Sequence, residues 1–81
     1  MKQNAKPKTY AARGMLDWKM AINVDGAILR IFFSGGYMGS NGVMAAKYTT
    51  DNPAIQNIIE KTEHFKTGRI YIYSTGGRNH A

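Results

Sequence analysis

The chain contains no cysteine, only two prolines, and only five acidic residues against eleven lysines and arginines. Without cysteine there are no disulfides and no thiolate zinc ligands, so a small fold must be stabilised by its core or by a partner. No apolar run is long enough to span a membrane, and the basic start lacks the apolar segment of a signal peptide. We therefore expect a soluble protein made in the cytoplasm, with one small core in its 81 residues.

The net charge of +6 is carried mainly by the two ends of the chain. Residues 1–14 hold four basic residues and no acid, residues 74–81 add one arginine, and the part between them is close to neutral. The basic residues near the start are Lys2, Lys6, Lys8 and Arg13. We expect 1–14 to be a flexible basic arm, 15–73 a single small α+β domain and 74–81 a flexible tail. Such ends either contact phosphate or an acidic protein surface, or stay solvated.

Residues 18–33 have the pattern of a β-hairpin that turns at Asp25 and Gly26. An Asp-Gly pair tolerates the positive φ angles that a two-residue hairpin turn requires. This turn pairs Val24 with Ala27 and places the apolar residues of both strands on one face. The further pairs on that face are Ile22 with Leu29, Met20 with Ile31, and Trp18 with Phe33. A slip of one residue would break every pair, so a single register is predicted.

The opposite face of the same hairpin is mixed in character. Ile28 and Phe32 fall there among Lys19, Asn23 and Arg30. Either another segment of this chain covers the two apolar residues, or the face is a subunit or partner interface. We take Ile28 and Phe32 as candidate contact residues.

Residues 34–42, with the sequence SGGYMGSNG, are rich in glycine. A phosphate-binding loop would also need a Lys followed by Ser or Thr at the start of a helix, and neither follows here. We expect a flexible connection between strands, followed by extended residues. Tyr37 and Met38, at its centre, are candidate contact residues.

Residues 53–62 are predicted to form the one helix of the domain. Pro53 suits the first helical position, and Asn52 before it is a good N-cap. The apolar stripe of this helix consists of Ala54, Ile55, Ile58 and Ile59 and is continued by Thr62. The polar side consists of Gln56, Asn57, Glu60 and Lys61. We expect the stripe to pack on a sheet.

The segment after the helix alternates as a strand does. Gly68 permits the turn into RIYIY, where Ile70 and Ile72 lie on one face and Tyr71 and Tyr73 on the other. Tyr71 and Tyr73 are candidate contact residues. The helix thus crosses between two strands, parallel or antiparallel. The expected fold class is α+β, a mainly β sheet or partly closed barrel of four or five strands with one helix packed on it.

Residues 48–72 resemble a pattern found in small structural proteins of tailed bacteriophages, in which an extended Tyr-x-Thr leads into a helix begun by Pro. The matching residues are Tyr48-Thr49-Thr50-Asp51-Asn52-Pro53, Ile55-Gln56, Ile59-Glu60, Phe65 and Gly68-Arg69-Ile70. The resemblance implies a multi-copy virion component of the capsid, the head–tail junction or the tail. Such a protein contacts other virion proteins or copies of itself, is assembled in the host cytoplasm and has no active site.

Candidate catalytic residues are few. His64 and His80 lack the spacing of a metal site, and Ser34, Ser40 and Ser74 lack the context of a nucleophile. We expect no enzyme, no metal and no cofactor. The alternative function is that of a small basic β-barrel in which outward tyrosines stack on bases and the basic termini contact phosphates of a nucleic acid.

Overall fold

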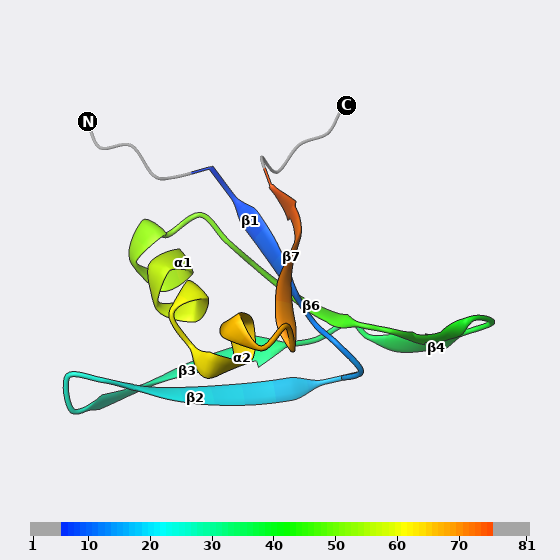
Figure 1. Cartoon of the computed structure of the whole chain (residues 1–81), viewed down its shortest axis with the longest axis horizontal. Coiled ribbons are helices and arrows are strands. Elements are labelled where there is room, and N and C mark those ends of the chain that lie inside the picture. The colour runs from blue at the N-terminus through cyan, green and yellow to red at the C-terminus, as the bar shows by residue number, and fades with distance from the viewer. Residues whose placement is uncertain (1–5, 76–81) are drawn as a thin grey trace.

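The computed structural model describes residues 6–75, which form seven strands and two short helices (Figure 1). In chain order these are β1 (Lys8–Ala12), β2 (Trp18–Val24), β3 (Ala27–Phe33), β4 (Tyr37–Gly39), β5 (Gly42–Met44), β6 (Ala46–Thr50), α1 (Pro53–Glu60), α2 (Glu63–Lys66) and β7 (Ile70–Thr75). The described strands form one three-stranded sheet in the order β6-β1-β7 and two hairpins, β2-β3 and β4-β5. This mainly β chain is compatible with the expected α+β class. The expected partly closed barrel is wrong, because the three sheets stay separate and open.

β1 is the central strand of the three-stranded sheet, which corrects the expectation of a flexible arm over 1–14. It pairs antiparallel with both β6 and β7, so these two strands run parallel to each other on either side of it. Tyr10, Ala11 and Ala12 have no exposed surface. β7 continues to Thr75, so the tail does not begin at 74. The rest of the expected arm and tail, 1–5 and 76–81, lies outside the described residues.

The β2-β3 hairpin has the predicted register throughout, from Val24 opposite Ala27 to Trp18 opposite Phe33. Its turn residues have positive φ angles, 51° at Asp25 and 85° at Gly26. Local turn chemistry and cross-strand pairing therefore agree on this hairpin, and the apolar face that they create is the one that the body covers. The buried side chains on that face are Met20, Ile31 and Phe33.

Helix α1 starts as predicted, and Ile55 and Ile59 of the expected stripe pack on the core, but the first turn presents another residue to the body. Asn52 Oδ1 accepts hydrogen bonds from the backbone N–H groups of Ala54 and Ile55, at 2.9 and 3.3 Å. Gln56 and Ile59 are the buried side chains of the helix, whereas Ala54 is exposed. The expected stripe is therefore wrong at its N-terminal end, where a polar residue points inward in place of an alanine.

The predicted helix over 53–62 ends two residues early, and a second short helix, which was not predicted, follows it. α1 ends at Glu60, and Thr62 caps the short α2 by accepting a hydrogen bond from the backbone N–H of Phe65 at 3.2 Å. The Phe65 ring then meets Tyr10 edge-on, with ring centroids 6.3 Å apart. The break at Thr62 turns the chain so that Phe65 reaches the core and Ile70 starts β7.

The core lies between the three-stranded sheet, the β2-β3 hairpin and α1, which sits above that hairpin in Figure 1. Its buried members come from every large element and are Tyr10, Ala12, Met20, Ile31, Phe33, Ala46, Ile59 and Ile70. Trp18 stacks on Phe33 with centroids 5.7 Å apart, and His64 of α2 contacts the Trp18 ring edge-on at 4.8 Å.

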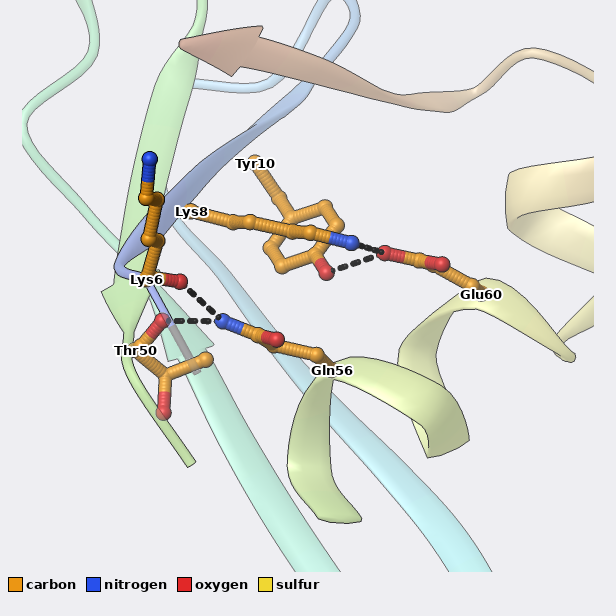
Figure 2. A network of polar contacts seen from close by, with 6 residues as sticks. All are labelled: Lys6, Lys8, Tyr10, Thr50, Gln56 and Glu60. Atoms are coloured by element: carbon orange, nitrogen blue, oxygen red, sulfur yellow. Dashed lines mark hydrogen bonds and ion pairs between the residues drawn. The ribbon is translucent and has the colours of Figure 1, made fainter. Parts of the chain in front are cut away.

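Gln56 attaches α1 to the start of the chain and to the end of β6 (Figure 2). Its Nε2 donates hydrogen bonds to the backbone carbonyls of Lys6 and Thr50, both at 2.9 Å. These carbonyls belong to segments that are distant in the sequence, so one buried amide joins three parts of the fold. This role explains why a polar side chain occupies the inner face of the helix.

Glu60, one turn further along α1, forms the second attachment (Figure 2). Its Oε2 accepts hydrogen bonds from Lys8 Nζ at 2.8 Å and from the Tyr10 hydroxyl at 2.6 Å. The bonds from Lys8 and then Tyr10 lower the pKa of the Glu60 carboxyl. Burial, followed by the bond to Glu60, raises the pKa of the Tyr10 hydroxyl. The helix is thus held on β1 by polar contacts as well as by Ile59.

Candidate interaction surfaces

The β4-β5 hairpin projects from the body, at the right of Figure 1, and carries four exposed apolar side chains. Tyr37, Met38, Val43 and Met44 have exposed fractions of 57, 67, 42 and 40%. Tyr37 is paired with Met44 and Met38 with Val43. Because successive residues of a strand point to opposite faces, both faces of the hairpin are apolar and uncovered. We call these four residues the hairpin patch.

The segment that we expected to be a flexible connection therefore forms a hairpin, and only half of its patch was predicted. Tyr37 and Met38 were candidates, whereas Val43 and Met44 were not. The missed signal was the pair Ser40-Asn41 between two glycines. A two-residue turn there pairs Gly39 with Gly42, as the structure does, and brings Val43 and Met44 opposite the two candidates.

The base of this hairpin packs closely against the body. The Gly36 N–H donates a hydrogen bond to the Leu16 carbonyl at 3.1 Å, and Ser34 and Lys47 exchange two backbone hydrogen bonds at 2.8 and 3.1 Å. A Cβ atom added at Gly36 would lie 2.7 Å from Leu16 Cα. The direction in which the hairpin projects is thus set by backbone contacts at its base.

The outer face of the β2-β3 hairpin is a second apolar surface. Ile28 and Phe32 are both 49% exposed, with Lys19 Nζ 5.9 Å from the centroid of the Phe32 ring. Within residues 6–75 no segment buries them, so the alternative of a cover from this part of the chain is wrong. Ile28 also lines a groove of about 280 Å³ together with Ile55 and Ile58 of α1.

The third surface is the face of the three-stranded sheet turned away from α1, which we call the outer sheet face. Arg13 lies over the Tyr71 ring, with its guanidinium carbon 4.6 Å from the centroid, and Lys47 Nζ lies 4.5 Å from the centroid of Tyr73. Arg13 Nε also donates a hydrogen bond to the Gly68 carbonyl at 3.1 Å. The structure thus brings the candidates Arg13, Tyr71 and Tyr73 together on one face. It adds Lys47, which the sequence analysis did not single out.

The remaining candidates are the lysines near the start of the chain. Lys8 is bound to Glu60 on the α1 side of the sheet, so its charge is already paired. Lys6 has an exposed side chain, and its carbonyl is held by Gln56. Lys2 lies outside the described residues. Seven of the ten candidates therefore lie on the three surfaces, two or three on each, instead of forming one site.

No chemical centre stands out in the described part of the chain. Residues 6–75 contain no cluster of three or more histidine or acidic side chains able to hold a metal ion. Neither helix of this range has the length and apolar character that a membrane crossing requires. His80 lies outside the described residues. The expectation that the protein is not an enzyme and needs no cofactor stays a prediction.

No protein-family model, no curated protein and no solved structure matches the chain. The resemblance of residues 48–72 to phage structural proteins therefore stays a prediction as well. The function has to be argued from the three surfaces, of which the hairpin patch is the most exposed apolar one.

Proposed function

We propose that the chain is a structural subunit of a multi-copy assembly, in particular a virion protein of a tailed bacteriophage. The observation that carries the proposal is the hairpin patch, four large apolar side chains on both faces of a projecting hairpin. The phage resemblance of residues 48–72 supplies the kind of assembly, a capsid, head–tail junction or tail formed in the host cytoplasm. The subunit acts through protein–protein contacts and not through catalysis.

Burial of the hairpin patch is where such an assembly gains free energy. A large apolar side chain contributes about 1.5–3 kcal/mol when it becomes fully buried. Four side chains that are each roughly half exposed would contribute about 3–6 kcal/mol by the same arithmetic. Within residues 6–75 no segment covers either apolar face of this hairpin, so a neighbouring subunit is what supplies this gain in the proposed assembly.

Two separate apolar surfaces suit a subunit with two neighbours. The β4-β5 hairpin, which carries the hairpin patch, lies at one end of the molecule in Figure 1. Ile28 and Phe32 lie elsewhere, on the outer face of the β2-β3 hairpin. Contacts between unlike surfaces of identical subunits generate rings when they close and filaments when they do not.

Mass spectrometry of gradient-purified particles tests the proposal. The protein should be present in many copies, and a double variant with Tyr37→Ser and Met38→Ser should keep its unfolding midpoint but lose incorporation. The matched control is Asn57→Ala, an exposed polar change on α1, which should incorporate normally. Absence of the protein from the particles, or normal incorporation of the double variant, would contradict the proposal.

A further inference from the structure

The outer sheet face is organised around Ala11, a residue that is fully buried although it does not belong to the core cluster. Ala11 is paired with Lys47 of β6 on one side and with Tyr71 of β7 on the other, so all three side chains point to the same face. The small alanine forms the floor on which larger side chains lie. Two tyrosine rings therefore lie on the outer sheet face, each with a cation against it.

A β-bulge in the pairing of β7 with β1 sets the position of the Tyr73 ring. The pairing of β7 with β1 shifts between Thr9 and Tyr10, which leaves Tyr73 without a partner residue on β1. Bulges re-aim side chains in this way. The Tyr73 ring reaches across the strand to Lys47 on β6 and is 58% exposed.

The charged side chains of the three strands that form this face are all positive. β1, β6 and β7 contain no Asp or Glu. Arg13 also lines, with Thr67, Gly68 and Arg69, a groove of about 330 Å³ beside the sheet. Glu60, the acid that contacts β1, lies on the α1 side, where Lys8 and Tyr10 bind it. Arg13, Lys47 and Arg69 therefore present positive charge that fits a polyanion.

The tyrosines distinguish a nucleic acid from an acidic protein. An acidic peptide would use the three cations and leave the rings without a role. Tyr71 and Tyr73 stand two positions apart on β7, about 6.6 Å along a strand, so two splayed bases can each meet a ring. An exposed cation–π contact is weaker than a base–aromatic stack, so bases can replace the cations on the rings while the cations move to phosphates.

We propose that the outer sheet face binds single-stranded nucleic acid, with Tyr71 and Tyr73 stacking on bases and Arg13, Lys47 and Arg69 contacting phosphates. This surface is separate from the hairpin patch, so the site stands whether or not the protein is a virion subunit. An open sheet with exposed aromatic rings is a recurrent platform for single strands, whose unstacked bases are accessible. Double strands hide their bases, so the tyrosine rings would have no base to stack on.

The first test measures the salt dependence of binding by the full chain. Fluorescence anisotropy with a labelled oligothymidylate of about 12 nucleotides should give a log–log slope near −2, from about −0.7 for each of roughly three phosphates. Arg13→Gln or Lys47→Gln should each make the slope shallower by about 0.7. Arg30→Gln, on the outer face of the β2-β3 hairpin, is the matched control and should leave the slope unchanged. An equal effect of all three variants would mean a diffuse charge effect and would overturn the site.

The second test separates stacking from charge. Tyr73→Leu should lower affinity about 5- to 150-fold at fixed salt with the slope unchanged, whereas Tyr37→Leu on the hairpin patch should change neither. Circular dichroism checks that each variant is folded. Unaltered affinity of Tyr73→Leu would overturn the proposal, as would equal affinity for a duplex of the same length. Equally tight binding of poly-glutamate would assign the face to an acidic protein instead.

Discussion

The two hairpins of this chain are built alike and placed differently. The β2-β3 hairpin has strands of seven residues, and its apolar face is covered by α1 and the three-stranded sheet. The β4-β5 hairpin has strands of three residues, and none of its side chains is buried. An apolar pattern on a hairpin thus does not tell core from interface. What decides is whether another element of the same chain lies over it.

The cover over the first hairpin depends on contacts that are distant in the sequence. α1 supplies Ile59 to the core, and its position on the sheet is maintained by Gln56 and Glu60. Within residues 6–75 the β4-β5 hairpin has no such element above it, and its backbone hydrogen bonds to the body lie at its base, near Gly36. We therefore expect substitutions to act on the stability of the covered hairpin and on the partner contacts of the uncovered one.

The largest expected difference comes from removing one aromatic ring from each hairpin. Phe33→Ala should cost about 3–5 kcal/mol in the free energy of unfolding, because a fully buried ring leaves a cavity. Tyr37→Ala in β4 should cost less than about 0.5 kcal/mol. Urea denaturation measures both. Similar losses at the two positions would mean that the projecting hairpin contributes to the core after all.

The second largest expected effect on stability comes from a substitution at Gly36, at the base of the β4-β5 hairpin. Gly36→Ala would place a Cβ atom 2.7 Å from backbone atoms of Leu16, which cannot move without distorting the chain. We expect a loss of about 1–3 kcal/mol, the usual cost of overpacking. Gly39→Ala is the matched control within the same hairpin, because its nearest neighbour is the flexible Met44 side chain at 3.2 Å. Equal unfolding midpoints for the two variants would show that the base is loosely packed.

The role of α1 in covering the β2-β3 hairpin is tested by a substitution at Gln56. Gln56→Ala leaves the carbonyls of Lys6 and Thr50 without their donor, which should cost about 1–3 kcal/mol. Asn57→Ala, the next residue on the exposed side of α1, should cost little. Hydrogen exchange should show faster exchange of β2-β3 amides in the Gln56 variant and no change in β4-β5. Unchanged exchange in β2-β3 would mean that α1 stays in place without this amide.

Local chemistry explains which parts of the fold were predictable. The Asp25-Gly26 turn and the Asn52-Pro53 helix start depend on neighbouring residues alone, and both were predicted correctly. β1 was missed because a Lys-Thr-Tyr-Ala-Ala segment has no strong strand pattern of its own. Its partners β6 and β7 lie dozens of residues further along the chain, and pairing with them is what buries its alanines.

The candidate surfaces show the same division. Strand parity, which is local, placed Ile28 and Phe32 on the mixed face of the hairpin, whereas the question of what covers that face was left open. Lys47 was missed because its contact with Tyr73 depends on the order of strands in the sheet. The inward face of α1 was mistaken at Gln56, since its partners are backbone carbonyls that no sequence pattern reveals.

The smallest expected effect is the pH dependence of the stability that Glu60 contributes by holding α1 on β1. Hydrogen bonds from Lys8 and Tyr10 lower the pKa of this carboxyl in the folded state below its ordinary value of 4.5. Its contribution to stability is therefore fully present above about pH 4.5 and is lost as the pH falls through the lower folded pKa. The ion pair is partly exposed, so the change should not exceed about 1 kcal/mol.

Urea denaturation of the Glu60→Gln variant between about pH 3 and pH 7 tests this dependence. Its stability should fall less steeply in acid than that of the unsubstituted protein, while Glu63→Gln, an exposed change in α2, should follow the unsubstituted protein. Tyr10 acts in the opposite pH direction, because burial raises the pKa of its hydroxyl above the ordinary value of 10. The contribution of Tyr10 to the stability of the fold is therefore fully present below about pH 10 and is lost as the pH rises through the higher folded pKa. An acid profile of Glu60→Gln parallel to that of the unsubstituted protein would show that the Glu60 carboxylate does not help to hold α1 on β1.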